Sequence, residues 1–104
     1  MNEIDFAKAS GLTLFRVNCV EDFVNILKNL YDCNIYTEIL KRRAKINIID
    51  KDIKIIIWYN EHECYCYYIY LYDRLIHTNI NNCSLTYACS LMVDTLRDFI
   101  LCYS

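Results

Sequence analysis

Two consecutive apolar runs, Ile53 to Asn60 and Cys64 to Tyr72, constrain the fold of this chain more than any other feature. Successive side chains of a β-strand point to opposite faces of the sheet. In the first run Ile55 alternates with Ile56 and Trp58, so that the run is apolar on both sides. A strand with one solvated face alternates apolar with polar residues instead. We therefore expect both faces of the sheet to be covered, one by helices and the other by something else, such as a second subunit.

A third apolar run, Lys45 to Asp50, precedes these two, and short polar segments connect all three. Asp50, Lys51 and Asp52 lie between the run that starts at Lys45 and the run that starts at Ile53. A short polar connection of this kind is a hairpin signal. Three successive strands with short connections predict an antiparallel meander. The residues from Asp73 to Asn82 either extend the third strand or loop away from it.

Two helices are expected around this sheet. Asn18 and Glu21 have the spacing of a capping box, and apolar residues at helical spacing follow them, which predicts a helix over residues 19–32. A second apolar stripe runs from Leu85 to Ile100, behind a helix start at residues 81–84. Residues 35–43 fit a helix or a strand, and Glu38 and its neighbours favour the helix.

Leu12 to Val17 is short, β-branched and aromatic, and it suits a further strand. The chain has 104 residues, the size of one domain, and we expect residues 1–104 to form it. The predicted fold class is α+β: a small antiparallel meander of three to four strands packed with two main helices. The expected order of elements is roughly β-α-β-β-β-α.

Composition excludes several classes of protein. The chain has one glycine and no proline, so the glycine-rich phosphate loops of nucleotide-binding enzymes are absent. Its seven cysteines, an odd number, together with a first segment unlike a signal peptide, predict free thiols in a reducing, cytoplasmic compartment. No apolar run reaches the length of a membrane span. We expect no cofactor.

His62, Cys64 and Cys66 are the sharpest group of potential metal ligands. In a strand, residues two apart face the same side, and imidazole and thiolate are good zinc donors. A fourth ligand is available from three other side chains, namely Cys33, His77 and Cys83. The spacing differs from that of standard zinc sites, and buried cysteines explain the same residues. A small zinc-binding protein is therefore an alternative.

Catalytic chemistry finds little support in the residues. A thiol nucleophile would require Cys83 near His77, or Cys64 near His62, with a group to orient the histidine. Pairs of acidic residues occur in polar connections, where solvated turn chemistry explains them. We assign no catalytic residue and expect the chain not to be an enzyme.

A basic segment precedes the meander. It consists of Lys41, Arg42, Arg43 and Lys45. Basic side chains contact phosphates, and aromatic side chains on a sheet stack on bases. The net charge of −2 does not favour this function. A nucleic-acid-binding domain is therefore also an alternative, ranked ahead of the zinc-binding protein.

The favoured interpretation uses the aromatic residues of the sheet for contacts with protein. Tyrosine and tryptophan are enriched at the energetic centres of protein interfaces. The expected interface residues are Trp58, Tyr68, Tyr70 and Tyr72. We expect a small non-enzymatic interaction module that forms a homodimer. The abundance of residues with A/T-rich codons suggests a regulator or inhibitor of a host protein, encoded by a virus or mobile element.

Overall fold

The computed structural model of the chain describes residues 17–31, 33–82 and 84–103, with side chains described as far as residue 98. Within these residues the fold is α+β. In chain order its elements are α2 (Val20–Leu30), β1 (Ile35–Ile39), β2 (Arg43–Ile48), the 3₁₀ turn η1 (Ile49–Lys51), β3 (Ile53–Tyr59), β4 (Tyr65–Leu71), β5 (Arg74–Asn82) and α3 (Leu85–Tyr103).

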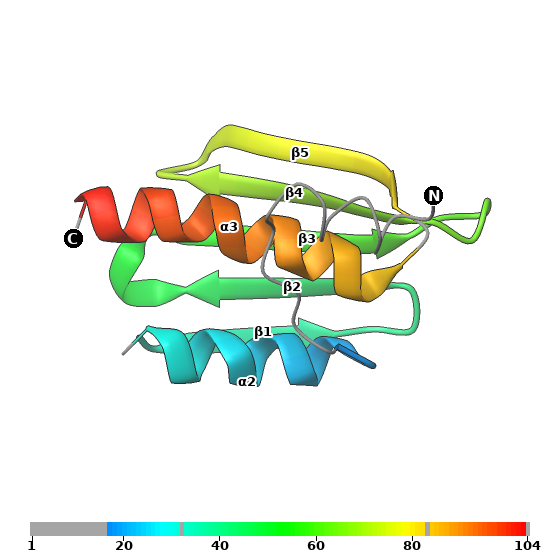
Figure 1. Cartoon of the computed structure of the whole chain (residues 1–104), viewed down its shortest axis with the longest axis horizontal. Coiled ribbons are helices and arrows are strands. Elements are labelled where there is room, and N and C mark those ends of the chain that lie inside the picture. The colour runs from blue at the N-terminus through cyan, green and yellow to red at the C-terminus, as the bar shows by residue number, and fades with distance from the viewer. Residues whose placement is uncertain (1–16, 32, 83, 104) are drawn as a thin grey trace, which may run out of the picture.

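The five strands form one antiparallel sheet in the order β1-β2-β3-β4-β5, which is also their order in the chain (Figure 1). The meander predicted from the sequence is confirmed, with β3 at its centre. Tyr72 and Asp73 connect β4 to β5, both in the left-handed region, with φ of 50° and 64°. Hairpin turns of this kind usually use glycine, but here non-glycine residues supply the positive φ angles.

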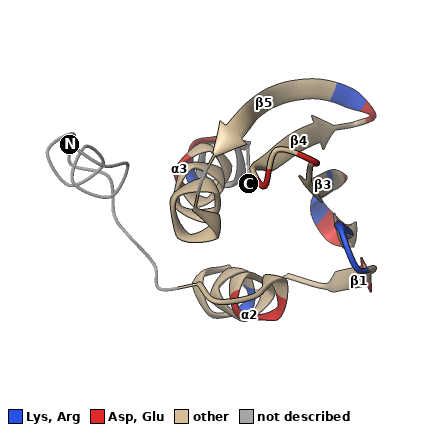
Figure 2. Ribbon diagram, turned by 90° about the vertical axis from the view of Figure 1, so that its right-hand side faces the viewer, with Lys and Arg blue, Asp and Glu red and all other residues tan. Residues whose placement is uncertain are grey.

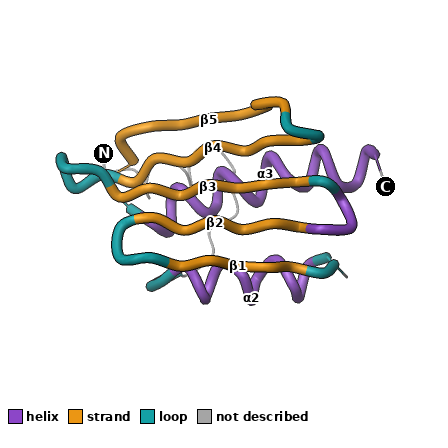
Figure 3. Tube along the Cα trace, turned by 180° about the vertical axis from the view of Figure 1, so that it is seen from behind, coloured by secondary structure: helices purple, strands orange, loops and turns teal. Residues whose placement is uncertain are grey.

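Both helices lie on the same face of the sheet (Figures 2 and 3). Figure 1 shows α2 running along β1, and α3 running over β3 and β4. The opposite face, which we call the open face, has no described element packed on it. The prediction that helices cover one face is confirmed.

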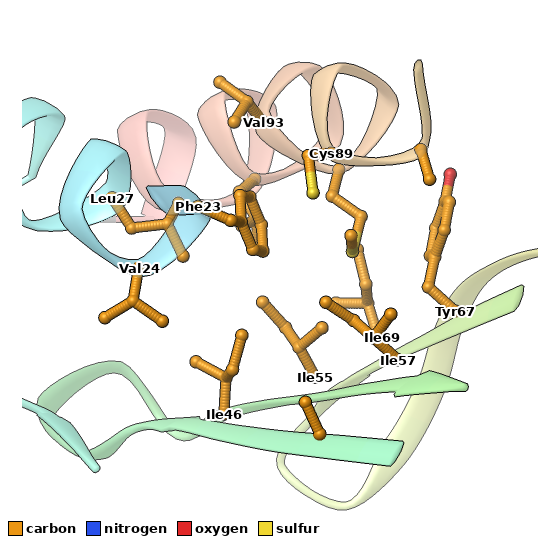
Figure 4. Close-up of a cluster of buried hydrophobic side chains, with 14 of the residues drawn as sticks. Phe23, Val24, Leu27, Ile46, Ile55, Ile57, Tyr67, Ile69, Cys89 and Val93 are labelled. Atoms are coloured by element: carbon orange, nitrogen blue, oxygen red, sulfur yellow. The ribbon is translucent and has the colours of Figure 1, made fainter. Parts of the chain in front are cut away.

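The core lies between the helices and the sheet. Phe23 and Leu27 of α2 point down towards Ile46 and Ile55 of the sheet, Ile69 lies on the side of α3, and all five side chains are fully buried (Figure 4). Burial of an aliphatic or aromatic side chain contributes about 1.5–3 kcal/mol. Alternate residues of the strands contact the two helices, and these contacts determine which face of the sheet points inwards.

Three predictions of local structure need correction. Residues 35–43 were expected to favour a helix, but they contain β1 and the start of β2. The physical reason is pairing: Ile35 lies opposite Ile48, and Ile39 lies opposite Ala44, so the edge strand covers apolar positions of β2. Tertiary pairing thus outweighs the helical propensity of Glu38 and Leu40.

The predicted capping box is also wrong in detail. The residue that caps α2 is Cys19, and no side chain caps the helix. The backbone N–H of Asn18 donates instead to Oδ2 of Asp22, at 3.0 Å. An acidic residue in the first turn thus still binds a backbone donor at this end, but it is Asp22 and not Glu21.

The number and order of strands differ from the prediction as well. Residues 74–82 form a separate strand, β5, so the described sheet has five strands. The described elements begin with a helix, because the strand expected over Leu12 to Val17 lies outside the described residues except for its last position.

Truncation of a buried isoleucine should lower the stability of the fold, whereas truncation of an exposed isoleucine should not. Ile55→Ala removes a fully buried side chain, so it should lower the free energy of unfolding by about 2–5 kcal/mol. Ile49→Ala, at a side chain that is 62% exposed, should change it by about 0.5 kcal/mol or less. Urea unfolding followed by circular dichroism measures both. Equal losses would contradict the assignment of the core.

Candidate functional site: the open face of the sheet

The side chains that point away from the helices form three rows across the strands. The central row follows the register of the sheet from β1 to β5 and consists of Glu38, Lys45, Ile56, Tyr68 and Thr78. A second row, nearer the connection between β2 and β3, consists of Tyr36, Asn47, Lys54, Tyr70 and Leu75. The third row contains Arg43, Trp58 and Cys66, with Ile80 added by the alternation along β5.

The apolar part of the open face lies over β3, β4 and β5. A hollow of about 470 Å³ occupies it, lined by Ile56, Trp58, Tyr68 and Tyr70 together with Arg43. Trp58 is 48% exposed, and Leu75 and Ile80 at the edge strand are at least half exposed. Contiguous exposed apolar surface of this kind marks interaction sites in proteins. Three of the four predicted interface residues, Trp58, Tyr68 and Tyr70, therefore lie together.

The charged part of the open face lies over β1, β2 and the start of β3. Three cations, Arg43, Lys45 and Lys54, share it with one carboxylate, Glu38. Nζ of Lys54 lies 5.0 Å from the centre of the Tyr70 ring, within the range of a cation–π interaction. The open face is thus divided into an aromatic and aliphatic half and a half with a net positive charge.

Tyr72, the fourth predicted interface residue, lies apart from the other three. It occupies the turn between β4 and β5 and is 70% exposed. Its side chain lines a different hollow of about 450 Å³ at the end of the open face, together with Tyr36, Lys45, Lys54, Asp52 and Asp73 among others. The alternation along β4 predicted that Tyr72 shares a face with Tyr68 and Tyr70. Because Tyr72 lies in the turn, it stands at the end of the open face, apart from the aromatic centre.

The predicted basic segment is split by the turn between β1 and β2. Arg43 and Lys45 lie on the open face, whereas Lys41 and Arg42 lie in the turn. Arg42 donates from Nε to the carbonyl oxygen of Tyr59 and from Nη2 to that of Asn60, at 3.3 and 3.2 Å. Its guanidinium carbon also lies 5.3 Å from the centre of the Tyr59 ring. Arg42 therefore links the turn between β1 and β2 to the start of the connection between β3 and β4.

The three predicted zinc ligands do not lie on one continuous strand, because a turn precedes β4. His62 is exposed in that turn, β4 begins only after Cys64, and Cys66 lies buried beside Trp58 on the open face. Asn60 organises the turn, because its Oδ1 accepts from the backbone N–H groups of His62 and Cys64. Among the residues that the structure describes, no three His, Cys, Asp or Glu side chains are grouped to hold a metal ion.

A polar pair inside the fold was not found from the sequence. The hydroxyl oxygen of Tyr67 lies 2.8 Å from Nε2 of His77, on the helix-facing side of β4 and β5. The Tyr67 side chain is fully buried, and burial raises the pKa of its phenol far above the usual value. His77 therefore contacts a buried tyrosine. Cys83, its proposed catalytic partner, lies outside the described residues.

Two further observations bear on function. Within the described parts of the chain, no helix is long and apolar enough to cross a membrane. Comparison of the chain with protein-family models, curated proteins and solved structures finds no match. The open face is therefore the feature of the molecule that bears most directly on its function.

The buried phenol predicts a loss of stability in alkaline solution. Above about pH 10 the tyrosine of the unfolded chain ionises while Tyr67 in the fold stays protonated. The unfolded state then binds fewer protons, so the free energy of unfolding falls as pH rises. Tyr67→Phe removes this group and should make the fall shallower, by up to about 1.4 kcal/mol per pH unit. Urea unfolding between about pH 9 and pH 11 measures it, and parallel curves for both proteins would contradict the assignment.

Proposed function

We propose that the chain is a non-enzymatic interaction module that binds protein through the open face of its sheet. The observation that carries the proposal is the position of Trp58, Tyr68 and Tyr70 around one hollow on a face that no described helix covers. Large aromatic side chains at the centre of a surface, bordered by polar and charged groups, are the arrangement of protein interfaces.

The neighbouring residues support the same function. Ile56 extends the apolar surface between Trp58 and Tyr68, and the cations lie at its border on β2 and β3. An interface of this kind excludes water from the centre, while charges at the rim select the partner. The expected role as a regulator of a host protein, and an origin in a virus or mobile element, fit such a module and stay predictions.

The proposal predicts that a protein partner is lost when the aromatic centre is truncated. Trp58→Ala and Tyr68→Ala should each weaken binding about 30-fold or more, as hot-spot substitutions do. Leu30→Ala is the matched control, because Leu30 is as exposed as Trp58 but lies at the end of α2 in the other layer. The measurement is quantitative capture by the tagged chain, after nuclease treatment, from cells that encode it.

The comparison among the three variants decides the outcome. A protein captured by the original chain and by Leu30→Ala, but lost with both aromatic variants, supports the proposal; an untagged copy of the chain counts as such a protein. If every captured protein binds all variants equally, the open face is not the binding surface and the proposal fails.

A second candidate function, nucleic-acid binding, is favoured by one specific observation. Arg43 and Lys45 lie on the same face as Trp58 and Tyr68, each cation in the same cross-strand row as one of the aromatic rings. Proteins that bind single strands combine aromatic rings that stack on bases with cations that follow the phosphates.

This candidate predicts salt-dependent binding of a mixed-sequence single-stranded oligonucleotide. The logarithm of the association constant should fall with the logarithm of salt concentration by about 0.7 for each phosphate contacted. Arg43→Ala and Lys45→Ala should each reduce that slope by about one contact, whereas Lys28→Ala, on α2, should leave it unchanged. Fluorescence anisotropy at two or more salt concentrations measures the slopes. Absence of binding at low salt removes the candidate.

A further inference from the structure

Resting on the proposed function, we propose that the partner on the open face is a second copy of this chain, packed face to face about a two-fold axis. The axis lies between the two sheets, perpendicular to the strands, beneath the central row that contains Ile56 and Tyr68. Each strand then lies across from the same strand of the other copy, running in the opposite direction.

The size of the face supports a second copy. Five strands spaced about 4.8 Å apart, with about six residues each at 3.4 Å, make a face of roughly 500 Å². Two such faces bury roughly 1,000 Å² when they cover each other, which is close to the minimum for a specific interface. A partner with a smaller surface would leave part of this face in water, whereas an identical sheet matches its extent.

The order of side chains in the three rows makes the face complementary to itself about this axis. Rotation leaves the central row opposite itself, so that Ile56 packs on Ile56 and Tyr68 on Tyr68. It brings the row of Lys54 and Leu75 opposite the row of Trp58 and Ile80. Lys54 then lies over the ring of Trp58, a favourable cation–π arrangement, and Leu75 contacts Ile80. Three of these four contacts are thus between apolar or aromatic groups, and the fourth joins a cation to an aromatic ring.

The charges are also compensated in this arrangement. Glu38 and Lys45 are opposite one another in the register of β1 and β2, so their charges offset one another within each copy. Across the axis each Lys45 comes near the carboxylate of the other copy as well as its own. Arg43 lies across from Asn47, a neutral acceptor. Because the central row lies opposite itself, Lys45 faces Lys45 and Glu38 faces Glu38 at the edge of the face, and these four groups together carry no net charge.

The other in-plane axis, parallel to the strands beneath β3, is less favourable. It would set Lys54 directly against Lys54 of the second copy, and the charged strands β1 and β2 against the apolar strands β4 and β5. Like charges in direct contact at an interface cost several kcal/mol. The perpendicular axis avoids this contact at the centre of the face, and its own like-charge contacts lie at the edge over β1 and β2, where Lys45 and Glu38 offset one another.

Trp58 allows a direct test, because it is the single tryptophan of the chain and lies on the proposed interface. On dimerisation its emission should shift to shorter wavelengths, and dilution should reverse the shift. The concentration at the midpoint should equal the dissociation constant from sedimentation equilibrium, which we expect in the micromolar range for an interface of this size.

Substitution at the axis tests which surface is buried. Ile56→Lys places two like charges against each other, so it should raise the dissociation constant at least about 30-fold and abolish the emission shift. Tyr68→Lys repeats the test if the first variant does not fold, as judged by circular dichroism. Leu30→Lys, a change of the same kind in the helical layer, should leave both measurements as in the original chain.

Cross-linking distinguishes the two axes. When Leu75→Cys and Ile80→Cys proteins are mixed, mild oxidation should join the two introduced thiols, as identified by mass spectrometry of the linked peptides. The strand-parallel axis predicts instead that Leu75→Cys joins to a Tyr36→Cys protein, because those positions would then face each other. That second product would overturn the proposed geometry.

Three results would overturn the dimer itself. They are a monomer at about 100 µM, an association that leaves Trp58 emission unchanged, and a dimer that tolerates both substitutions at the axis. In each case the capture experiment with Trp58→Ala and Tyr68→Ala still decides the proposed function, since a different protein partner would be lost there. Quenching of Trp58 by an oligonucleotide, in a chain that stays monomeric, would favour nucleic-acid binding instead.

Discussion

The burial of one face of the sheet under α2 and α3 is the interaction on which the rest of the structure depends. Ile46, Ile55 and Ile69, on three adjacent strands, contact the helices and are fully shielded from water. Because alternate residues of a strand point in opposite directions, this burial also determines which residues point the other way. Ile56, Trp58 and Tyr68 lie on the open face because their neighbours in the chain are in the core.

The two faces use the same residue types for different purposes. On the helix side, isoleucines are packed by helical side chains and contribute stability to the isolated chain. On the open side, isoleucine and aromatic residues lie beside cations and one carboxylate, a mixture that the interior of a domain does not tolerate without pairing. The apolar character of both faces thus has two origins, and only the inner one is explained by the fold of a single chain.

Prediction from the sequence succeeded where a local pattern had a single structural meaning. The double-sided apolar runs of β3 and β4 predicted a sheet with one face beyond the reach of its helices. Where local and long-range preferences differ, it failed: residues 35–39 pair with β2 despite their helical propensity. β5 is polar over much of its length, so its sequence did not distinguish a strand from a loop. The contact of Tyr67 with His77 depends on strand register, which the sequence pattern does not specify.

The meander also keeps the strand pairings of the sheet local in the sequence. Every strand pairs with its neighbour in the sequence, so each hairpin closes a short loop at little entropic cost, and proteins dominated by such local contacts fold quickly. The two helices lie at opposite ends of this series, and the bond between the backbone N–H of Val17 and Oγ1 of Thr86 spans 69 residues. The sheet can therefore form strand by strand before its ends meet, and during that interval the isoleucines of its inner face are as exposed as the aromatic residues of its outer one.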